Sequence, residues 1–164
     1  MLEHTCLIVH PWTPDAACWL RHVSDQTGVL LGCVRHEGAE RGSWFSWLRK
    51  IKLDVFETED ASHLMALHRA WGMRRSWHVH DAEDLYVGTL HWGSLASSDG
   101  VTLGDLEGDS DSGQIIDSAG TTLASYRKNL DAAVAVTFAK DAMGNPFLRM
   151  LLLGSILVLE PAPN

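Results

Sequence analysis

Histidine is the first residue type in this chain that could do chemistry, because several of its nine histidines follow a strand-like spacing. His78 and His80 alternate with Trp77 and Val79, so a strand would place both imidazoles on one face. His91, in the next strand-like run, could add a third nitrogen, as in zinc sites. A half-exposed strand gives the same alternation without a metal, and we therefore expect no metal and no cofactor.

The acidic stretch from Ser98 to Gly113 is a second candidate, because its carboxylates suggest a calcium loop. With Asp109 at the first loop position, Gln114 stands where an EF-hand requires glycine. Gly120 then stands where the bidentate glutamate belongs. We expect a mobile, solvated loop between hairpins instead of a calcium site.

Catalytic signatures are missing from the sequence. It contains no G-x-S-x-G, no P-loop and no G-x-G-x-x-G, so neither acyl nor phosphate chemistry has a supporting motif. Serine, histidine and aspartate occur only at scattered positions, as in any chain of this length. We expect no catalytic residues and no enzymatic activity.

Residues 42–52 form the best candidate for a lipid-binding surface. If this segment is helical, its apolar residues share one face and its basic residues gather elsewhere, which is the layout of an interfacial anchor. The apolar residues are Trp44, Trp47, Leu48 and Ile51, and the basic residues are Arg49, Lys50 and Lys52. Each basic group near an anionic surface contributes about 1 kcal/mol of attraction.

A second basic cluster, Arg74 and Arg75 beside Trp71, could hold a phosphate through charge-assisted hydrogen bonds. Both clusters have a simpler interpretation. Tryptophan in a single domain usually packs in the core or at its rim, and the basic side chains would then only be solvated.

A repeated unit provides the elements that must position these residues. Four times, an acidic residue is followed six positions later by a five-residue phrase that starts with a large apolar residue and ends with a basic one. The acids are Asp25, Glu59, Asp81 and Asp117, and their phrases start at Leu31, Met65, Val87 and Leu123. Each unit is typical of a β-hairpin with the acid at the turn, where its carboxylate accepts backbone hydrogen bonds.

The second and fourth positions of each phrase are expected to face the interior, because the basic fifth residue prefers water and side chains alternate along a strand. Position two is always small, and its residues are Gly32, Ala66, Gly88 and Ala124. Position four is held by Val34, His68, Leu90 and Tyr126. Small inward-facing residues predict that a bulky element occupies the interior.

Residues 147–159 break the repeat after a last acidic turn at Asp141. They follow Pro146, are apolar on nearly every side and are mostly good helix formers. A bilayer span needs about 20 apolar residues. We therefore expect a buried core helix and no transmembrane segment.

Composition indicates one domain over residues 1–164, since 46% hydrophobic residues and seven tryptophans suffice for a sizeable core. Three cysteines without C-x-x-C spacing are most simply free thiols of a reducing compartment, and no secretory signal is apparent at the N-terminus, so we expect a cytoplasmic protein. The net charge of −8 argues against nucleic-acid binding.

Two parts of the chain resemble phospholipid scramblases. Residues 136–141 with 150–160 are similar to the end of that family, where a strand leads into an apolar, glycine-containing terminal helix that ends in glutamate. Residues 77–80 with 87–92 resemble a scramblase hairpin that carries a G-x-I motif and then tryptophan. The similarity covers most of residues 18–160 and extends to the tubby C-terminal-like superfamily, including the LURP-one-related proteins of plants.

The resemblance implies a mainly β fold, a closed twelve-strand antiparallel barrel around a central hydrophobic C-terminal helix. It also implies a non-enzymatic domain that associates peripherally with membranes through phospholipids, phosphoinositides included.

Family features are missing at two places. The chain starts almost directly with the barrel, without the family's palmitoylated cysteine cluster, and Leu130, Ala132 and Ala133 occupy positions where the family's calcium segment has oxygen ligands.

Two alternatives to lipid association remain. One is a protein-interaction or structural barrel with the same fold and no lipid activity. The other is an open barrel that binds a small molecule, which requires an empty interior.

Overall fold

One antiparallel sheet closes into a barrel in the computed structural model, which describes residues 1–15, 18–37, 51–58, 62–70 and 76–160. The strands are β1 (Cys6–Val9), β2 (Thr13–Asp15), β3 (Cys18–Ser24), β4 (Leu30–Glu37), β5 (Lys52–Glu57), β6 (His63–Arg69), β7 (Ser76–Asp81), β8 (Tyr86–His91), β9 (Ser94–Ser97), β10 (Thr102–Gly108), β11 (Ser112–Ile116), β12 (Thr122–Lys128) and β13 (Val134–Phe138). A 3-10 helix, η2 (Lys140–Gly144), leads into the helix α1 (Pro146–Leu157).

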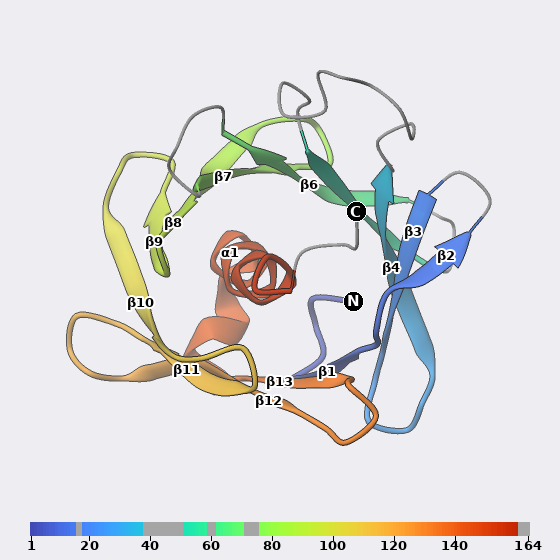
Figure 1. The fold of residues 1–164 in the computed structure, drawn as a ribbon. Helices are drawn as coiled ribbons and strands as arrows, with labels where there is room; N and C mark the ends of the chain where they lie inside the picture. Colours follow the sequence, from blue (N-terminus) through green and yellow to red (C-terminus); the bar gives the residue numbers. More distant parts are fainter. Residues whose placement is uncertain (16–17, 38–50, 59–61, 71–75, 161–164) are drawn as a thin grey trace.

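Closure of the barrel depends on β1. This strand pairs with β13 along its whole length, from Cys6 opposite Thr137 to Val9 opposite Val134. Its other edge pairs with β3, and the short β2 continues along the same edge of β3. From β3 to β13 each strand pairs with the next, so β1 and these eleven strands form a closed ring of twelve, with β2 as an extension. The predicted twelve-strand antiparallel barrel is confirmed (Figure 1).

Helix α1 lies in the middle of the ring (Figure 1). Asn145 caps its N-terminus by accepting a hydrogen bond from Leu148 N at 3.1 Å, and Pro146 occupies the first turn. All residues from Arg149 to Leu157 are buried, as an all-round apolar helix requires. The prediction of a buried terminal helix is confirmed, although the helix starts one residue before the expected range and ends two residues earlier. No helix among the described residues is long and apolar enough to cross a membrane.

The predicted aspartates stand at the turns. Asp25 Oδ1 accepts hydrogen bonds from Thr27 N and Val29 N at 2.8 and 2.9 Å, and the carboxylates of Asp81 and Asp117 make the same pair of bonds in their own turns. The third residue after each acid has a positive φ, and these residues are Gly28, Asp84 and Gly120. The hydroxyl of Thr27, followed by the backbone N–H groups, lowers the pKa of Asp25 below its usual value.

These turns all lie at one end of the barrel. They join β3 to β4, β7 to β8 and β11 to β12, and a similar turn from Ser97 to Val101 joins β9 to β10. Alternate connections of an antiparallel meander share an end, and α1 also begins there, because β13 runs toward that end. We call it the turn end. The fourth predicted acid, Glu59, lies outside the described residues.

Small residues allow the helix and the sheet to approach closely. A Cβ atom on Gly88 would lie 3.1 Å from Leu151 of the helix, which confirms that Gly88 faces α1. A Cβ atom on Gly32 would instead meet Met1 Sδ at 3.1 Å. On the helix side, a Cβ atom on Gly154 would lie 3.0 Å from Leu67 Cδ2.

Two expectations about the strands are wrong. In β6, Leu67 faces the helix, so Ala66 and His68, which were expected to face inward, lie on the other face, where His68 stacks on His80. Burying Met65 and Leu67 removes more apolar surface from water than burying Ala66 and His68 would. The stretch from Ser98 to Gly113 is also no mobile loop. It contains β10, whose Leu103 and Leu106 pack against the core and whose backbone pairs with β9 and β11.

Glu160 fastens the C-terminal end of the helix to the barrel wall. Its carboxylate binds Arg21 Nη2 at 2.9 Å and also forms an ion pair with Lys128, while its carbonyl accepts a hydrogen bond from Trp12 Nε1 at 3.2 Å. Arg21 is only 1% exposed and donates a second hydrogen bond to His10 O. A guanidinium this deeply buried needs a counter-ion, because an unpaired buried charge is costly.

Replacing Gly154 by leucine is expected to destabilise the protein by about 2 kcal/mol or more, because the added side chain would collide with Leu67, Leu90 and Val79. Urea unfolding measures this change. Gly144→Leu is the matched control, since a Cβ atom there meets nothing within 4 Å. Equal midpoints for the two variants would show that the helix does not pack against the sheet at Gly154.

Replacing Glu160 by glutamine is expected to lower the free energy of unfolding by about 3 kcal/mol, because the buried Arg21 loses its counter-ion. Lys128→Met, which removes the more exposed of the two cationic partners, should cost clearly less, because solvent screens that ion pair. The same urea titrations compare both variants. A larger loss for Lys128→Met would contradict the assignment of Arg21 as the main partner.

Candidate functional site

The interior of the barrel is filled, so candidate sites lie on its outside. Leu151, Leu152 and Leu153 of the helix are fully buried against the strands. The closest strand side chains to Gly154 come from β6, β7 and β8. This arrangement removes the empty interior that the open-barrel alternative requires.

Lys52 is the one predicted lipid-binding residue that the structure describes. Trp44, Trp47, Arg49, Lys50, Arg74 and Arg75 all lie outside the described residues. Lys52 opens β5, its side chain is 44% exposed, and its Nζ pairs with Asp54 Oδ1 at 2.8 Å. His63 Nε2 lies 3.2 Å from the same carboxylate oxygen. The charge of Lys52 is therefore largely balanced by Asp54.

Several histidines gather beside Lys52 on the outer surface of β6 and β7. The strand register places His68 opposite both Lys52 and His78, and it places His80 two residues further along β7, opposite Ala66. The rings of His68 and His80 stack with centroids 4.9 Å apart and planes at 22°. We call His63, His68, His78 and His80 the histidine cluster.

Burial keeps His68 neutral at neutral pH. Desolvation lowers the pKa of its imidazole, and the positive charges of His80 and Lys52 lower it further against the opposing effect of nearby carboxylates. The buried Nε2 atom of His68 has no hydrogen-bond partner among the described residues. A proton on His68 would therefore be poorly stabilised.

The three histidines considered as zinc ligands do not converge. His78 and His80 each lie 5.8 Å from the ring of Tyr86, whereas His91 packs edge-on against Trp92 at 6.4 Å. Within the described ranges, no group of three or more His, Cys, Asp or Glu residues is placed to hold a metal ion. The zinc hypothesis thus gains no support from the geometry.

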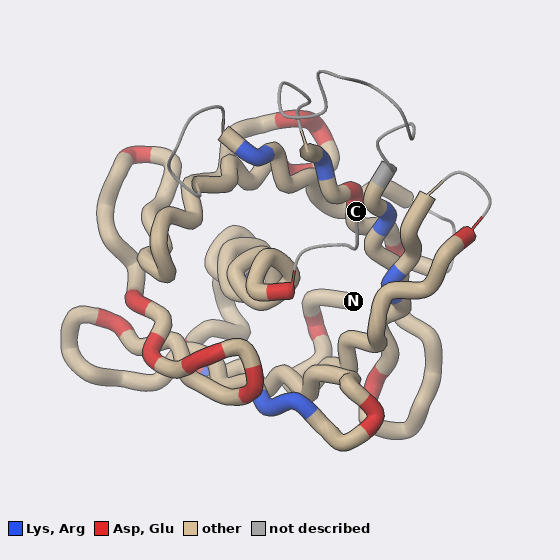
Figure 2. The backbone as a smooth tube through the Cα atoms, in the orientation of Figure 1, with Lys and Arg blue, Asp and Glu red and all other residues tan. Residues whose placement is uncertain are grey.

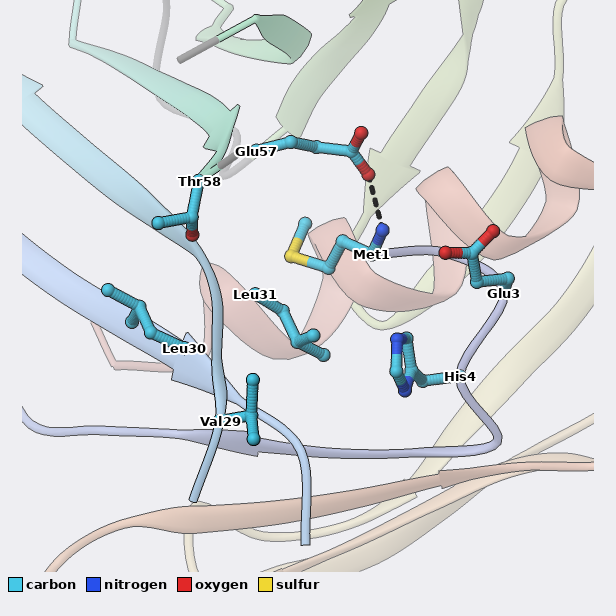
Figure 3. A pocket seen from close by; sticks show the side chains of 8 residues that line it. All are labelled: Met1, Glu3, His4, Val29, Leu30, Leu31, Glu57 and Thr58. Atoms are coloured by element: carbon cyan, nitrogen blue, oxygen red, sulfur yellow. Dashed lines mark hydrogen bonds and ion pairs between the residues drawn. The ribbon is translucent and has the colours of Figure 1, made fainter. Parts of the chain in front are cut away.

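A small pocket of about 140 Å³ opens at the turn end (Figure 3). Its lining comes from the first residues of the chain, the start of β4 and the end of β5, and consists of Met1, Glu3, His4, Val29, Leu30, Leu31, Glu57 and Thr58. The N-terminal ammonium of Met1 forms an ion pair with Glu57. The walls thus combine aliphatic side chains with two carboxylates.

Sequence reasoning missed this pocket, and no signal in the sequence could have revealed it. Met1 and Glu57 lie 56 positions apart and meet only because closure of the barrel brings the chain start beside β5. Val29, Leu30 and Leu31 form a short apolar run, which by itself indicates only a strand.

Comparison with known proteins shows the fold and nothing finer. The chain is similar to an X-ray structure of a protein from Arabidopsis thaliana, with a TM-score of 0.52 and 13% sequence identity over 91% of both chains. No family model matches the sequence, and no curated protein does. At this identity the likeness extends to the barrel architecture alone.

His68 is expected to make the protein less stable in mild acid. Its folded pKa is lowered, so between that value and the unfolded value of about 6.5 the unfolded chain binds more protons. Stability is therefore complete above pH 6.5 and decreases as the pH falls through that interval. Urea unfolding at pH 7 and pH 5 should show a smaller loss for His68→Phe than for the wild type.

His22→Phe is the matched control for this pH experiment, because His22 is exposed on β3. The control should lose as much stability between the two pH values as the wild type does. An unchanged loss in His68→Phe would show that His68 does not resist protonation in the folded state.

Proposed function

We propose that this chain is a non-enzymatic barrel domain of the scramblase and tubby type that associates peripherally with anionic phospholipid surfaces, phosphoinositides included. The observation that supports it most is the filled interior. With α1 inside the ring, a ligand has to be bound by surface residues. The richest basic and aromatic sequence for that purpose is residues 42–52, with Arg74 and Arg75 as a second cluster.

The direction of the strands gives this proposal an orientation. β4 begins at the turn end, so β4 finishes and β5 begins at the opposite end of the barrel. Lys52, the first residue of β5, therefore lies toward that opposite end. We propose that this end faces the membrane.

Electrostatics favours the same orientation. Acidic residues are more numerous than basic ones around the ring of strands (Figure 2), and the net charge is −8. Such a protein is repelled by an anionic surface unless it presents a local basic region. The carboxylates of Asp25, Asp81 and Asp117 stand at the turn end, so that end is the less favourable one to approach such a surface.

Lys52 has a smaller role than Arg49 and Lys50 in this proposal. Its ammonium is already paired with Asp54 at 2.8 Å, and moving it to a lipid phosphate would break that ion pair. We therefore assign the main attraction to Arg49, Lys50 and the neighbouring tryptophans Trp44 and Trp47, with Lys52 in support.

Reversing the charges of Arg49 and Lys50 together is expected to weaken binding to anionic vesicles at least about tenfold, because each basic group contributes about 1 kcal/mol near such a surface. Sedimentation with phosphatidylcholine vesicles, with and without phosphatidylserine or a phosphatidylinositol bisphosphate, measures this effect. Lys52→Glu should have a smaller effect. Arg74→Glu with Arg75→Glu tests the second cluster in the same assay.

Arg127→Glu with Lys140→Glu is the matched control, because both residues are exposed and the change in net charge is the same. Equal losses for this control and for the Arg49 and Lys50 variant would mean that net charge alone governs binding. If the wild type binds no vesicle at all, the interaction barrel without lipid activity replaces this proposal.

A further inference from the structure

Among the described residues, most of the exposed large apolar side chains lie at the turn end. Val29, Leu85 and Val101 are 58%, 60% and 56% exposed, and Phe147 at the start of α1 is 53% exposed. Leu30 and Tyr86, which open β4 and β8 beside the same turns, are exposed as well. These side chains stand on separate connections around the rim of the barrel, with the β3–β4 and β9–β10 turns on opposite sides of the ring, so a partner contacts them together only if it spans this end.

The turns themselves do not need these apolar residues. Val29, Leu85 and Val101 occupy the same place, four residues after Asp25, Asp81 and Ser97, where only their backbone takes part in the turn. In the remaining turn of this kind, Thr121 fills the place with the same backbone bonds. Three apolar residues at solvent-exposed positions that tolerate threonine therefore suggest a role outside the fold.

The pocket of about 140 Å³ lies beside two of these residues, Val29 and Leu30 (Figure 3). Leu31 extends its aliphatic wall, and the carboxylates of Glu3 and Glu57 supply its negative charge. Glu57 is paired with the Met1 ammonium, whereas Glu3 makes no hydrogen bond or ion pair within the described part of the chain and interacts only through its charge with the buried guanidinium of Arg149. A lysine or arginine side chain matches such walls, with its methylene groups on the leucines and its cation near Glu3.

The charge of the turn end also indicates which kind of partner can bind there. Carboxylates stand in or beside nearly every turn, and they belong to Glu3, Asp25, Glu57, Asp81, Glu83, Asp84, Asp99, Asp117 and Asp141. Among the described residues of this end, Lys140 is the only exposed lysine or arginine. This sign of charge repels anionic lipid and nucleic acid and attracts cationic protein segments.

We propose that the turn end binds a segment of another protein in which lysine or arginine alternates with large apolar residues. The apolar side chains of that segment rest on Val29, Leu85, Val101 and Phe147, and one basic side chain enters the pocket beside Glu3. This surface lies opposite the end assigned to lipid, so both can be occupied together. The inference does not depend on lipid binding.

A fluorescently labelled peptide of alternating lysine and leucine tests this assignment by fluorescence polarisation. Replacing Val29, Leu85 and Val101 together by threonine keeps the net charge and should weaken binding at least about tenfold. Trp92→Ser with Leu130→Ser is the control, since these exposed apolar residues belong to turns at the opposite end, and it should change binding less than about twofold. Glu3→Gln should weaken binding several-fold.

Two further peptides separate the apolar from the ionic contribution. A peptide of alternating glutamate and leucine, and one of alternating lysine and serine, should each bind the wild type at least about tenfold more weakly. Unfolding midpoints in urea verify that the threonine variant is folded, and the Arg49 and Lys50 variant should bind the lysine and leucine peptide as the wild type does.

Three results would overturn the proposal. One is unchanged peptide binding by the threonine variant, and another is equal binding of the glutamate and leucine peptide. The third is dimerisation of the wild type in sedimentation velocity that the threonine variant abolishes, because a second copy of this chain would then occupy the surface.

Discussion

A helix that is apolar on every side must be enclosed on every side, and this requirement governs the structure. An open sheet would bury only one face of α1, whereas the closed ring buries residues from Arg149 to Leu157. The fit requires small residues where helix and strand meet, such as Gly154 on the helix and Gly88 on β8. The filled interior also moves every candidate binding surface to the outside, which is why the function of this barrel has to be sought at its ends and on its outer wall.

The two ends of the barrel differ in chemistry. The turns at Asp25, Asp81 and Asp117, the start of α1 and the pocket beside Glu57 lie at one end, and a turn at Asp109 lies at the other. At the other end, Glu160 fastens the helix to the buried Arg21. Between the two ends lies a close-packed core formed by the helix and the inner faces of the strands.

Much of this architecture could be predicted from local patterns in the sequence. The prediction of a hairpin turn at Asp25 was correct because the aspartate, its hydrogen-bond donors and the following glycine are neighbours along the chain. The prediction of a buried terminal helix was correct because a helix that is apolar on nearly every side is stable only when it is buried. The prediction that His68 faces the interior was wrong because the burial of Met65 and Leu67 decides which face of β6 turns inward. Pairs such as Met1 with Glu57 leave no local signal, since only the closed barrel brings them together.

Closure through β1 also constrains how the protein is made. Cys6 pairs with Thr137, so the first strand of the ring has to wait for the last strand of the ring before its second edge is covered. The helix that fills the ring is synthesised later still. Until the ring closes, the growing sheet therefore exposes an apolar inner face and two unpaired edges, which are features that favour edge-to-edge aggregation.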